Sequence, residues 1–323
     1  MGGYTRAQLQ EQYDRFKTYA HEGVITAASM LLYGINEEGK MTWWDTSEPS
    51  WSIKKFQQDM GELGLKKVPL FFCDSTIGNC SPLGPILQAV YDRQEAFISE
   101  SLQEASAYGW DGYAIDFEAF GFIDSKKLMS FTCKWAEALD KAGLHLMVWT
   151  GGPTFYDLEG LSACKGVSSA VTMDSYGISS SSGFSSFAER YMQSVPGHRA
   201  GFGILVPPQR LPEGLRAQVD REMTGKWLTV ASMGGFSDSL TSAESVLMTP
   251  GKESDEEVFG DSFMDDVGGW CHERGVESLG LWASYVPPEW YNGLRSFLST
   301  DRAEQEGRKT EGGDGLSERV HYV

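Results

Sequence analysis

Short apolar segments typical of β-strands recur along the chain, and segments with helical spacing separate several of them. Eight such runs occur, at residues 24–33, 67–73, 111–118, 144–150, 168–177, 200–206, 227–234 and 278–284. Helical patterns occur at residues 51–64, 93–109, 125–143 and 260–275. Strands that alternate with helices are joined by crossover connections and therefore run parallel. The pattern predicts an α/β fold, a (β/α)8 barrel in a single domain.

An open, doubly wound parallel sheet is the alternative arrangement of the same elements. Such sheets commonly bind nucleotides through a G-x-G-x-x-G loop after a strand, and the sequence offers no such loop. We expect the barrel to span residues 1–300, with an N-terminal helix and an acidic insertion near residues 236–262. Residues 301–323 are polar and charged without a periodic apolar face, so we expect them to form a disordered tail.

The formal net charge of −18 limits the partners of the chain. A charge of this sign is repelled by a nucleic-acid backbone and by an anionic membrane surface, so we expect neither as a partner. No apolar run approaches the length of a membrane span, and the N-terminal region lacks the hydrophobic core of a secretory signal. A cytoplasmic protein with a neutral substrate is the resulting expectation.

The cysteines and histidines give no metal-binding pattern. The cysteines are Cys73, Cys80, Cys133, Cys164 and Cys271. Because their number is odd and no C-x-x-C spacing occurs, we expect free buried thiols instead of disulfides or a zinc site. The histidines at positions 145, 198 and 272 form no recognisable ligand cluster. We therefore expect no metal and no cofactor.

Charged side chains interrupt the third apolar run, "DGYAIDFE". In a strand, Ala114, Asp116 and Glu118 point to one face and the residues between them to the other. On a surface strand such carboxylates would simply lie in water. In a barrel they would face the axis, and Glu118 would lie at the carboxyl end of its strand, where barrel active sites form. Buried carboxylates are costly unless they are paired, hydrogen-bonded or used, so we predict Asp116 and Glu118 to be catalytic.

The same run resembles the strand signature of family 18 glycoside hydrolases, the chitinase and chitobiase group, which is written D-G-x-D-x-D-x-E. Asp111, Gly112, Asp116 and Glu118 match this signature, and Ala114 stands at the first Asp of its D-x-D-x-E part. In this family the 2-acetamido oxygen of the substrate is the nucleophile. The resemblance implies that Glu118 is the acid and then the base, and that Asp116 holds the acetamido group. It leaves Asp111, Gly112 and Ala114 as motif positions with structural roles.

Two later runs are also similar to strands of this family. "AVTMDSYG" resembles the strand that supplies a Met-x-Tyr-Asp group, although Asp174 here precedes Tyr176. "LGLWAS" resembles the last strand, whose tryptophan forms the floor of the sugar site, which implies that role for Trp282. We expect Asp174 and Tyr176 on the same face of one strand, and Trp149 as a weaker candidate for stacking. Each of these aromatic residues could instead be an ordinary packing residue.

These features predict a retaining glycosidase that acts on β-linked N-acetylglucosamine, in chito-oligosaccharide or in the chitobiose core of an N-glycan. The alternative is a catalytically weak or inactive chitinase-like lectin, against which the presence of Glu118 counts. A third possibility is a barrel enzyme of different chemistry that converged on the same motif. In the resembled family one more strand precedes the one that residues 24–33 resemble, so residues 227–234 would have to close the barrel.

Overall fold

The computed structural model describes residues 6–43, 49–74, 83–118, 123–151, 156–176, 178–205, 262–282, 290–298 and 320–322. The strands are β1 (Ala27–Ala28), β2 (Leu31–Ile35), β3 (Met41–Trp43), β4 (Lys66–Lys67), β5 (Leu70–Asp74), β6 (Gly112–Glu118), β7 (His145–Thr150), β8 (Val167–Thr172), β9 (Ala200–Leu205), β10 (Ser278–Trp282) and β11 (Val320–Tyr322). The helices are α1 (Arg6–His21), α2 (Pro49–Glu62), α3 (Leu83–Asp92), α4 (Gln94–Tyr108), α5 (Ser125–Lys141), α6 (Leu158–Ala163), α7 (Ser181–Tyr191) and α9 (Phe263–Glu273). Residues 290–298 are also helical.

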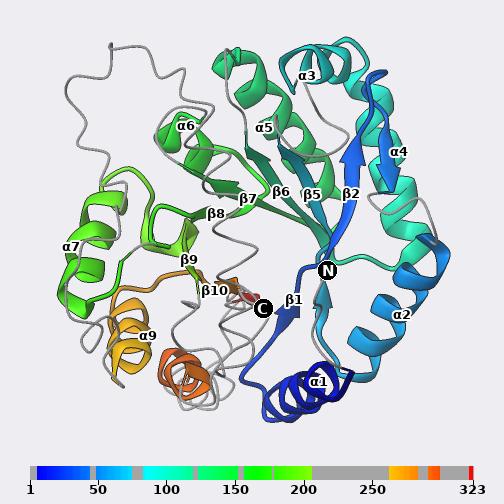
Figure 1. Cartoon of the computed structure of the whole chain (residues 1–323). Coiled ribbons are helices and arrows are strands. Elements are labelled where there is room, and N and C mark those ends of the chain that lie inside the picture. The colour runs from blue at the N-terminus through cyan, green and yellow to red at the C-terminus, as the bar shows by residue number, and fades with distance from the viewer. Residues whose placement is uncertain are drawn as a thin grey trace, which may run out of the picture.

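The sheet closes on itself because each of its first two strands has two parts that pair at different places. Strands β1 and β2 are consecutive parts of one strand, and β4 and β5 are parts of the next. The Lys66 N–H donates to the Thr26 carbonyl at 3.0 Å in the first parts, and the Leu70 N–H donates to the Met30 carbonyl at 2.8 Å where the second parts begin. The order continues through β6, β7, β8, β9, β10 and β11, and β11 pairs back with β1. In the described part of the chain, eight parallel strands thus form a (β/α)8 barrel, which confirms the predicted fold (Figure 1).

Seven of the eight runs predicted to be strands contain one. The remaining run, residues 227–234, and the acidic insertion near 236–262 lie outside the described residues. The expectation of a disordered tail is wrong for residues 320–322, which form β11 between β10 and β1. Three residues are too few to show a hydrophobic period, and the segment around them is polar. The sequence pattern therefore did not predict this strand.

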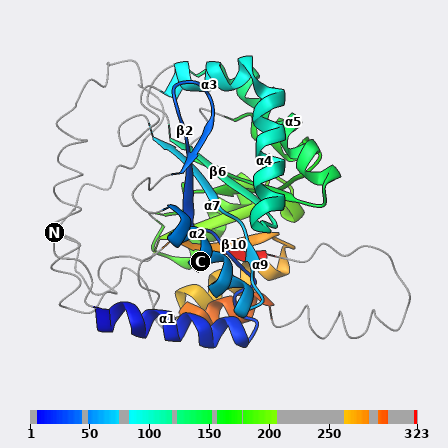
Figure 2. The same ribbon diagram turned by 90° about the vertical axis from the view of Figure 1, so that its right-hand side faces the viewer.

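Helices surround the strands (Figure 1). The four predicted helical segments correspond to α2, α4, α5 and α9, and α1 is the expected N-terminal helix. Helices α1 and α3 lie on opposite sides of the barrel in both views (Figures 1 and 2). Helix α1 packs beside the helix at residues 290–298, where the Tyr19 and Tyr291 rings stack with centroids 3.8 Å apart.

Strand side chains alternate between two hydrophobic clusters, which are the barrel interior and the layer under the helices. The interior cluster contains Ala27, Val68, Leu70, Ala114, Met147, Trp149 and Val171. On β6 the outward residues are Tyr113, Ile115 and Phe117, and all three are buried under the helices. The Tyr113 hydroxyl donates to the Ser101 carbonyl of α4 at 2.7 Å, and Trp135 Nε1 of α5 donates to Ser101 Oγ at 2.9 Å. These contacts fix the face that β6 turns toward the axis.

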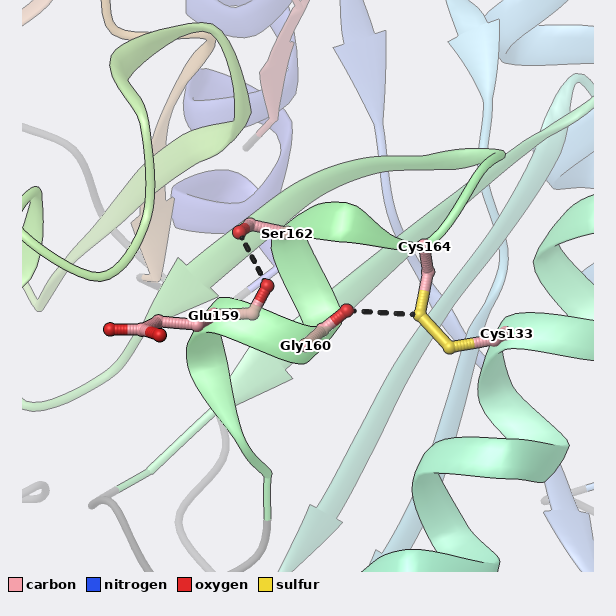
Figure 3. The surroundings of a disulfide bond; sticks show 5 residues. All are labelled: Cys133, Glu159, Gly160, Ser162 and Cys164. Atoms are coloured by element: carbon pink, nitrogen blue, oxygen red, sulfur yellow. Dashed lines mark hydrogen bonds between the residues drawn. A yellow bond between two sulfur atoms is a disulfide. The ribbon is translucent and has the colours of Figure 1, made fainter.

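A disulfide joins two helices on the outside of the barrel. Cys133 on α5 and Cys164, which follows α6, are bonded with their Cα atoms 5.1 Å apart (Figure 3). Cys73 is also disulfide-bonded, whereas Cys271 is a buried free thiol. The expectation of free thiols is therefore wrong for three cysteines, because pairing depends on proximity in space and Cys133 and Cys164 are 31 residues apart in sequence.

Candidate active site

Strand β6 positions Asp116 on the inner wall of the barrel. Its neighbours in register are Phe72 on β5 and Trp149 on β7. Ala114, two residues earlier on the same face, belongs to the interior cluster. Asp116 is 3% exposed, so its carboxylate lies within the protein and not in bulk water. A carboxylate with so little solvent interacts strongly with any polar group or ligand beside it.

Glu118 is the last residue of β6, at the carboxyl end of the strand. Its partner in register is Asp74, the last residue of β5. Two acidic residues therefore end neighbouring parallel strands at the same edge of the barrel. Sequence analysis missed Asp74, although an acid that ends the apolar run "PLFFCD" was the available signal. This edge is where barrel enzymes place their catalytic groups.

Asp111 and Gly112 lie at the opposite end of β6 and hold the strand in place. Asp111 Oδ2 accepts a hydrogen bond from the Lys67 N–H at 2.8 Å, and the Asp111 N–H donates to the Lys67 carbonyl at 2.9 Å. A Cβ atom at Gly112 would overlap the backbone of His145, so only glycine permits this approach of β7. These two positions set the register of β6 and lie far from its acidic carboxyl end.

Trp149 and Tyr176 meet above Gly203, a residue of β9 that sequence analysis did not single out. Trp149 is 4% exposed, and the partly buried Tyr176 packs against the same interior cluster. A Cβ atom at position 203 would lie 2.9 Å from Trp149 Cζ3 and 2.7 Å from Tyr176 Cε1. Because Trp149 is also the register partner of Asp116, the structure brings both aromatic residues and this carboxylate to one part of the barrel interior.

The expectation that Asp174 and Tyr176 share one face of a strand is wrong. Strand β8 ends at Thr172, and the residues that follow form a turn in which the Tyr176 N–H donates to the Met173 carbonyl at 2.9 Å. The Ser175 hydroxyl fixes this turn by donating to the Gly203 carbonyl at 2.6 Å. The turn leaves Asp174 exposed while Tyr176 packs on the interior cluster.

Trp282 is the last residue of β10 and lies in register with Leu205 on β9. Its backbone is therefore at the same carboxyl edge of the barrel as Glu118 and Asp74. In register order, β7, β8 and β9 lie between β6 and β10. Trp282 and the acidic pair thus come from different sectors of one rim.

Tyr156, which precedes α6, is an additional buried group whose charge state depends on its surroundings. Burial raises the pKa of its phenol, the Thr132 hydroxyl lowers it in part, and Asp116 is among the charges that raise it further. The phenol therefore stays protonated at neutral pH and remains a hydrogen-bond donor. Sequence analysis missed Tyr156, which no periodic pattern singled out.

Comparison with known proteins identifies the fold. No protein-family model and no curated protein matches the chain. The structure is similar to a chitinase from Chromobacterium violaceum, at 16% identity over 92% of this chain and 97% of that chain, with a TM-score of 0.62. A class V chitinase from Pseudomonas fluorescens gives 14% identity, coverages of 91% and 98%, and a TM-score of 0.62. The spore cortex-lytic enzyme SleL from Bacillus megaterium gives 12% identity, coverages of 91% and 71%, and a TM-score of 0.60. The chain therefore has the barrel fold of these proteins.

Proposed function

We propose that this chain is a retaining glycoside hydrolase of the family 18 type, which cleaves β-linked N-acetylglucosamine in chito-oligosaccharides or in the chitobiose core of N-glycans. The observation that carries the proposal is the placement of Asp116 and Glu118 on one strand of a chitinase-like barrel. Asp116 is buried on the inner wall, and Glu118 ends the same strand at the catalytic edge. The buried Trp149 beside Asp116 supports a sugar-binding role for this wall.

The chemistry proceeds in two steps. In the first step Glu118 donates its proton to the glycosidic oxygen, while the 2-acetamido oxygen of the substrate attacks the anomeric carbon and the leaving sugar departs. Asp116 orients the acetamido group and stabilises the positive charge that develops on it. In the second step Glu118, now a carboxylate, removes a proton from water, which opens the cyclic intermediate with net retention at the anomeric carbon.

The backbone register gives Asp74 a part in this proposal. Asp74 and Glu118 are register partners at the carboxyl ends of β5 and β6, so Asp74 is a further acidic residue at the catalytic edge. Trp149, Tyr176 and Trp282 contribute aromatic surface for sugar stacking, and Asp174, which is exposed, has a peripheral role at most.

The disulfides favour an oxidising compartment over the cytoplasm that the sequence suggested. Disulfides of the Cys133–Cys164 kind persist where thiols are not kept reduced. Within the described residues, no helix combines the length and apolarity that a membrane crossing requires. We therefore propose that the protein acts on glycans in an oxidising environment.

The test is hydrolysis of aryl chitobioside and chitotriose by the purified chain beside its Glu118→Gln variant. Loss of the general acid should lower kcat/KM by about 100-fold or more. Glu159→Gln, an exposed change on α6, is the matched control and should leave the rate unchanged. Binding of chito-oligosaccharide without turnover by the unmodified chain would support the lectin instead, and the absence of both would reject this substrate class.

A further inference from the structure

The inner wall of the barrel carries little side-chain bulk at two levels of β9 and β10. Phe202, Ile204, Leu279 and Leu281 belong to the outer cluster, so the residues between them face the axis. Those inward positions are Gly201 and Gly203 on β9, and Ser278 and Gly280 on β10. Gly203 pairs with Gly280 at one level, and Gly201 pairs with Ser278 one level below. Two neighbouring strands therefore present bare backbone at the Gly203 level.

The lower level is closed by a polar contact. Ser169 Oγ and Ser278 Oγ are hydrogen-bonded at 2.6 Å, and both residues are buried. A Cβ atom at Gly201 would overlap both hydroxyl groups. Gly201 thus has a packing role one level below Gly203, where the three atoms nearest to the added Cβ belong to Ser278, Ser169 and Val171 and not to either ring. This difference makes it the matched control for Gly203.

At the upper level the Trp149 and Tyr176 rings occupy the space that a side chain on Gly203 would need. A Cβ atom would lie 2.7 and 2.9 Å from ring carbons and 3.3 Å from the Thr172 carbonyl oxygen. The atoms closest to it belong to rigid rings, so relief requires a whole ring to move. The missing side chain therefore determines how deeply both rings lie against β9.

We infer that Gly203 is a positioning residue that sets the aromatic floor of the sugar site. This inference rests on the proposed function, because the ligand is the N-acetylated sugar of that proposal. A pyranose ring stacks its apolar face on the rings, and Trp149 neighbours Asp116 across β6 and β7. The floor at this depth lets the sugar descend far enough for its acetamido group to reach Asp116. A side chain at position 203 would push the two rings away from β9. The acetamido group of the sugar would then stay out of reach of Asp116.

The test compares Gly203→Ala with Gly201→Ala and Gly269→Ala in hydrolysis of aryl chitobioside. Gly269 lies on α9, where an added Cβ meets nothing within 4 Å. We expect Gly203→Ala to raise KM by about tenfold, the loss expected when binding contacts are misplaced. Gly269→Ala should leave KM unchanged, and Gly201→Ala should lower the unfolding temperature with a KM change within about twofold. Equal KM changes in Gly203→Ala and Gly201→Ala would overturn the inference, because both would then act through general packing.

Near-ultraviolet circular dichroism separates this inference from the proposed function. Gly203→Ala should change the aromatic spectrum, and the change should shrink in a Trp149→Phe background, as a double-mutant cycle of touching groups requires. An unchanged spectrum, or a change that persists fully in that background, would overturn the positioning of Trp149 by Gly203. If the unmodified chain neither hydrolyses nor binds chito-oligosaccharide, the sugar role fails with the proposed function, and the spectral cycle still decides the positioning role.

Discussion

At the scale of single residues, Ala114 lies one pleat below Asp116 on the inner wall of the barrel. It is fully buried, and its partners in register are the apolar Leu70 and Met147. The resembled signature has an Asp at this position, whereas this barrel holds the Asp116 carboxylate above an apolar layer. Asp116 thus lacks an acidic neighbour directly below it on β6.

Introducing that carboxylate should shift the pH dependence of hydrolysis. In Ala114→Asp, repulsion between the added carboxylate and that of Asp116 should raise the pKa at which the two groups ionise together. The acid limb of the pH–rate profile should therefore move to higher pH. Ala114→Asn adds a similar volume without charge and is the control. Both variants should lose about 2 kcal/mol or more of unfolding free energy, because each buries a polar group among apolar neighbours. Coincident pH–rate profiles of the two variants would contradict this role of Ala114.

Glu104 on α4 should make stability depend on pH. Burial raises the pKa of its carboxyl above the ordinary 4.5, although a hydrogen bond from the Tyr33 hydroxyl lowers it in part. A raised folded-state pKa contributes stability below the unfolded value, and that contribution is lost as pH rises through the folded value. The stability of Glu104→Gln relative to the unmodified chain should therefore increase from about pH 4 to pH 7 in urea unfolding. The exposed Glu95→Gln is the control, and a difference independent of pH would refute the prediction.

Individual site residues were predictable where strand alternation decides their direction. The inward direction of Asp116 follows from the alternation in "DGYAIDFE", because the apolar and acidic faces of that run are distinct. Tyr176 was expected near the site for the wrong reason, since the turn fixed by Ser175 and not a continued strand returns it to the barrel. Gly203 was not predictable, because the need for glycine there depends on two rings from other elements.

At the scale of elements, the α5–α6 pair is held by a covalent bond as well as by packing. Replacing Cys133 and Cys164 by Ser should lower the unfolding free energy by about 2–4 kcal/mol, because the bond restricts the unfolded chain. Urea unfolding under oxidising conditions measures this difference. Under reducing conditions the double variant and the unmodified chain should converge, and a gap of the same size in both conditions would show that the bond does not form.

Long periodic segments were predictable as elements, and short ones were not. Helix α5 was readable because Leu128, Phe131, Trp135 and Leu139 recur at helical spacing, and all four are buried. Helix α6 has six residues and α7 begins in a serine-rich segment, so neither shows a clear period. Sequence patterns also could not identify the Cys133–Cys164 bond, which results from the packing of two helices.

At the scale of the whole molecule, the C-terminal strand β11 completes the barrel. It pairs with β10 through three residues and with β1 through Ala27 and Tyr322. The alternation of strands and helices predicted a barrel correctly. Which segment forms the last strand, however, depends on which one pairs with both β10 and β1. A three-residue segment has too little pattern for that assignment from sequence.

Truncation of the chain after residue 319 should open the ring between β10 and β1. The loss of the backbone hydrogen bonds on both sides of β11 should reduce the unfolding free energy on the order of 3 kcal/mol, at about 1 kcal/mol per bond. Removal of Val323 alone, which follows β11, should have little effect. Thermal unfolding of the three proteins measures both changes, and equal stabilities would show that β11 does not close the barrel.

The stereochemistry of hydrolysis tests the glycosidase proposal most directly. Proton NMR of chitotriose digestion records which anomer of the product appears first, before mutarotation mixes the two. Substrate-assisted catalysis by Asp116 and Glu118 predicts the β-anomer first, with its appearance abolished by Asp116→Ala and by Glu118→Gln. Initial release of the α-anomer, or the absence of any hydrolysis by the unmodified chain, would contradict the proposed chemistry.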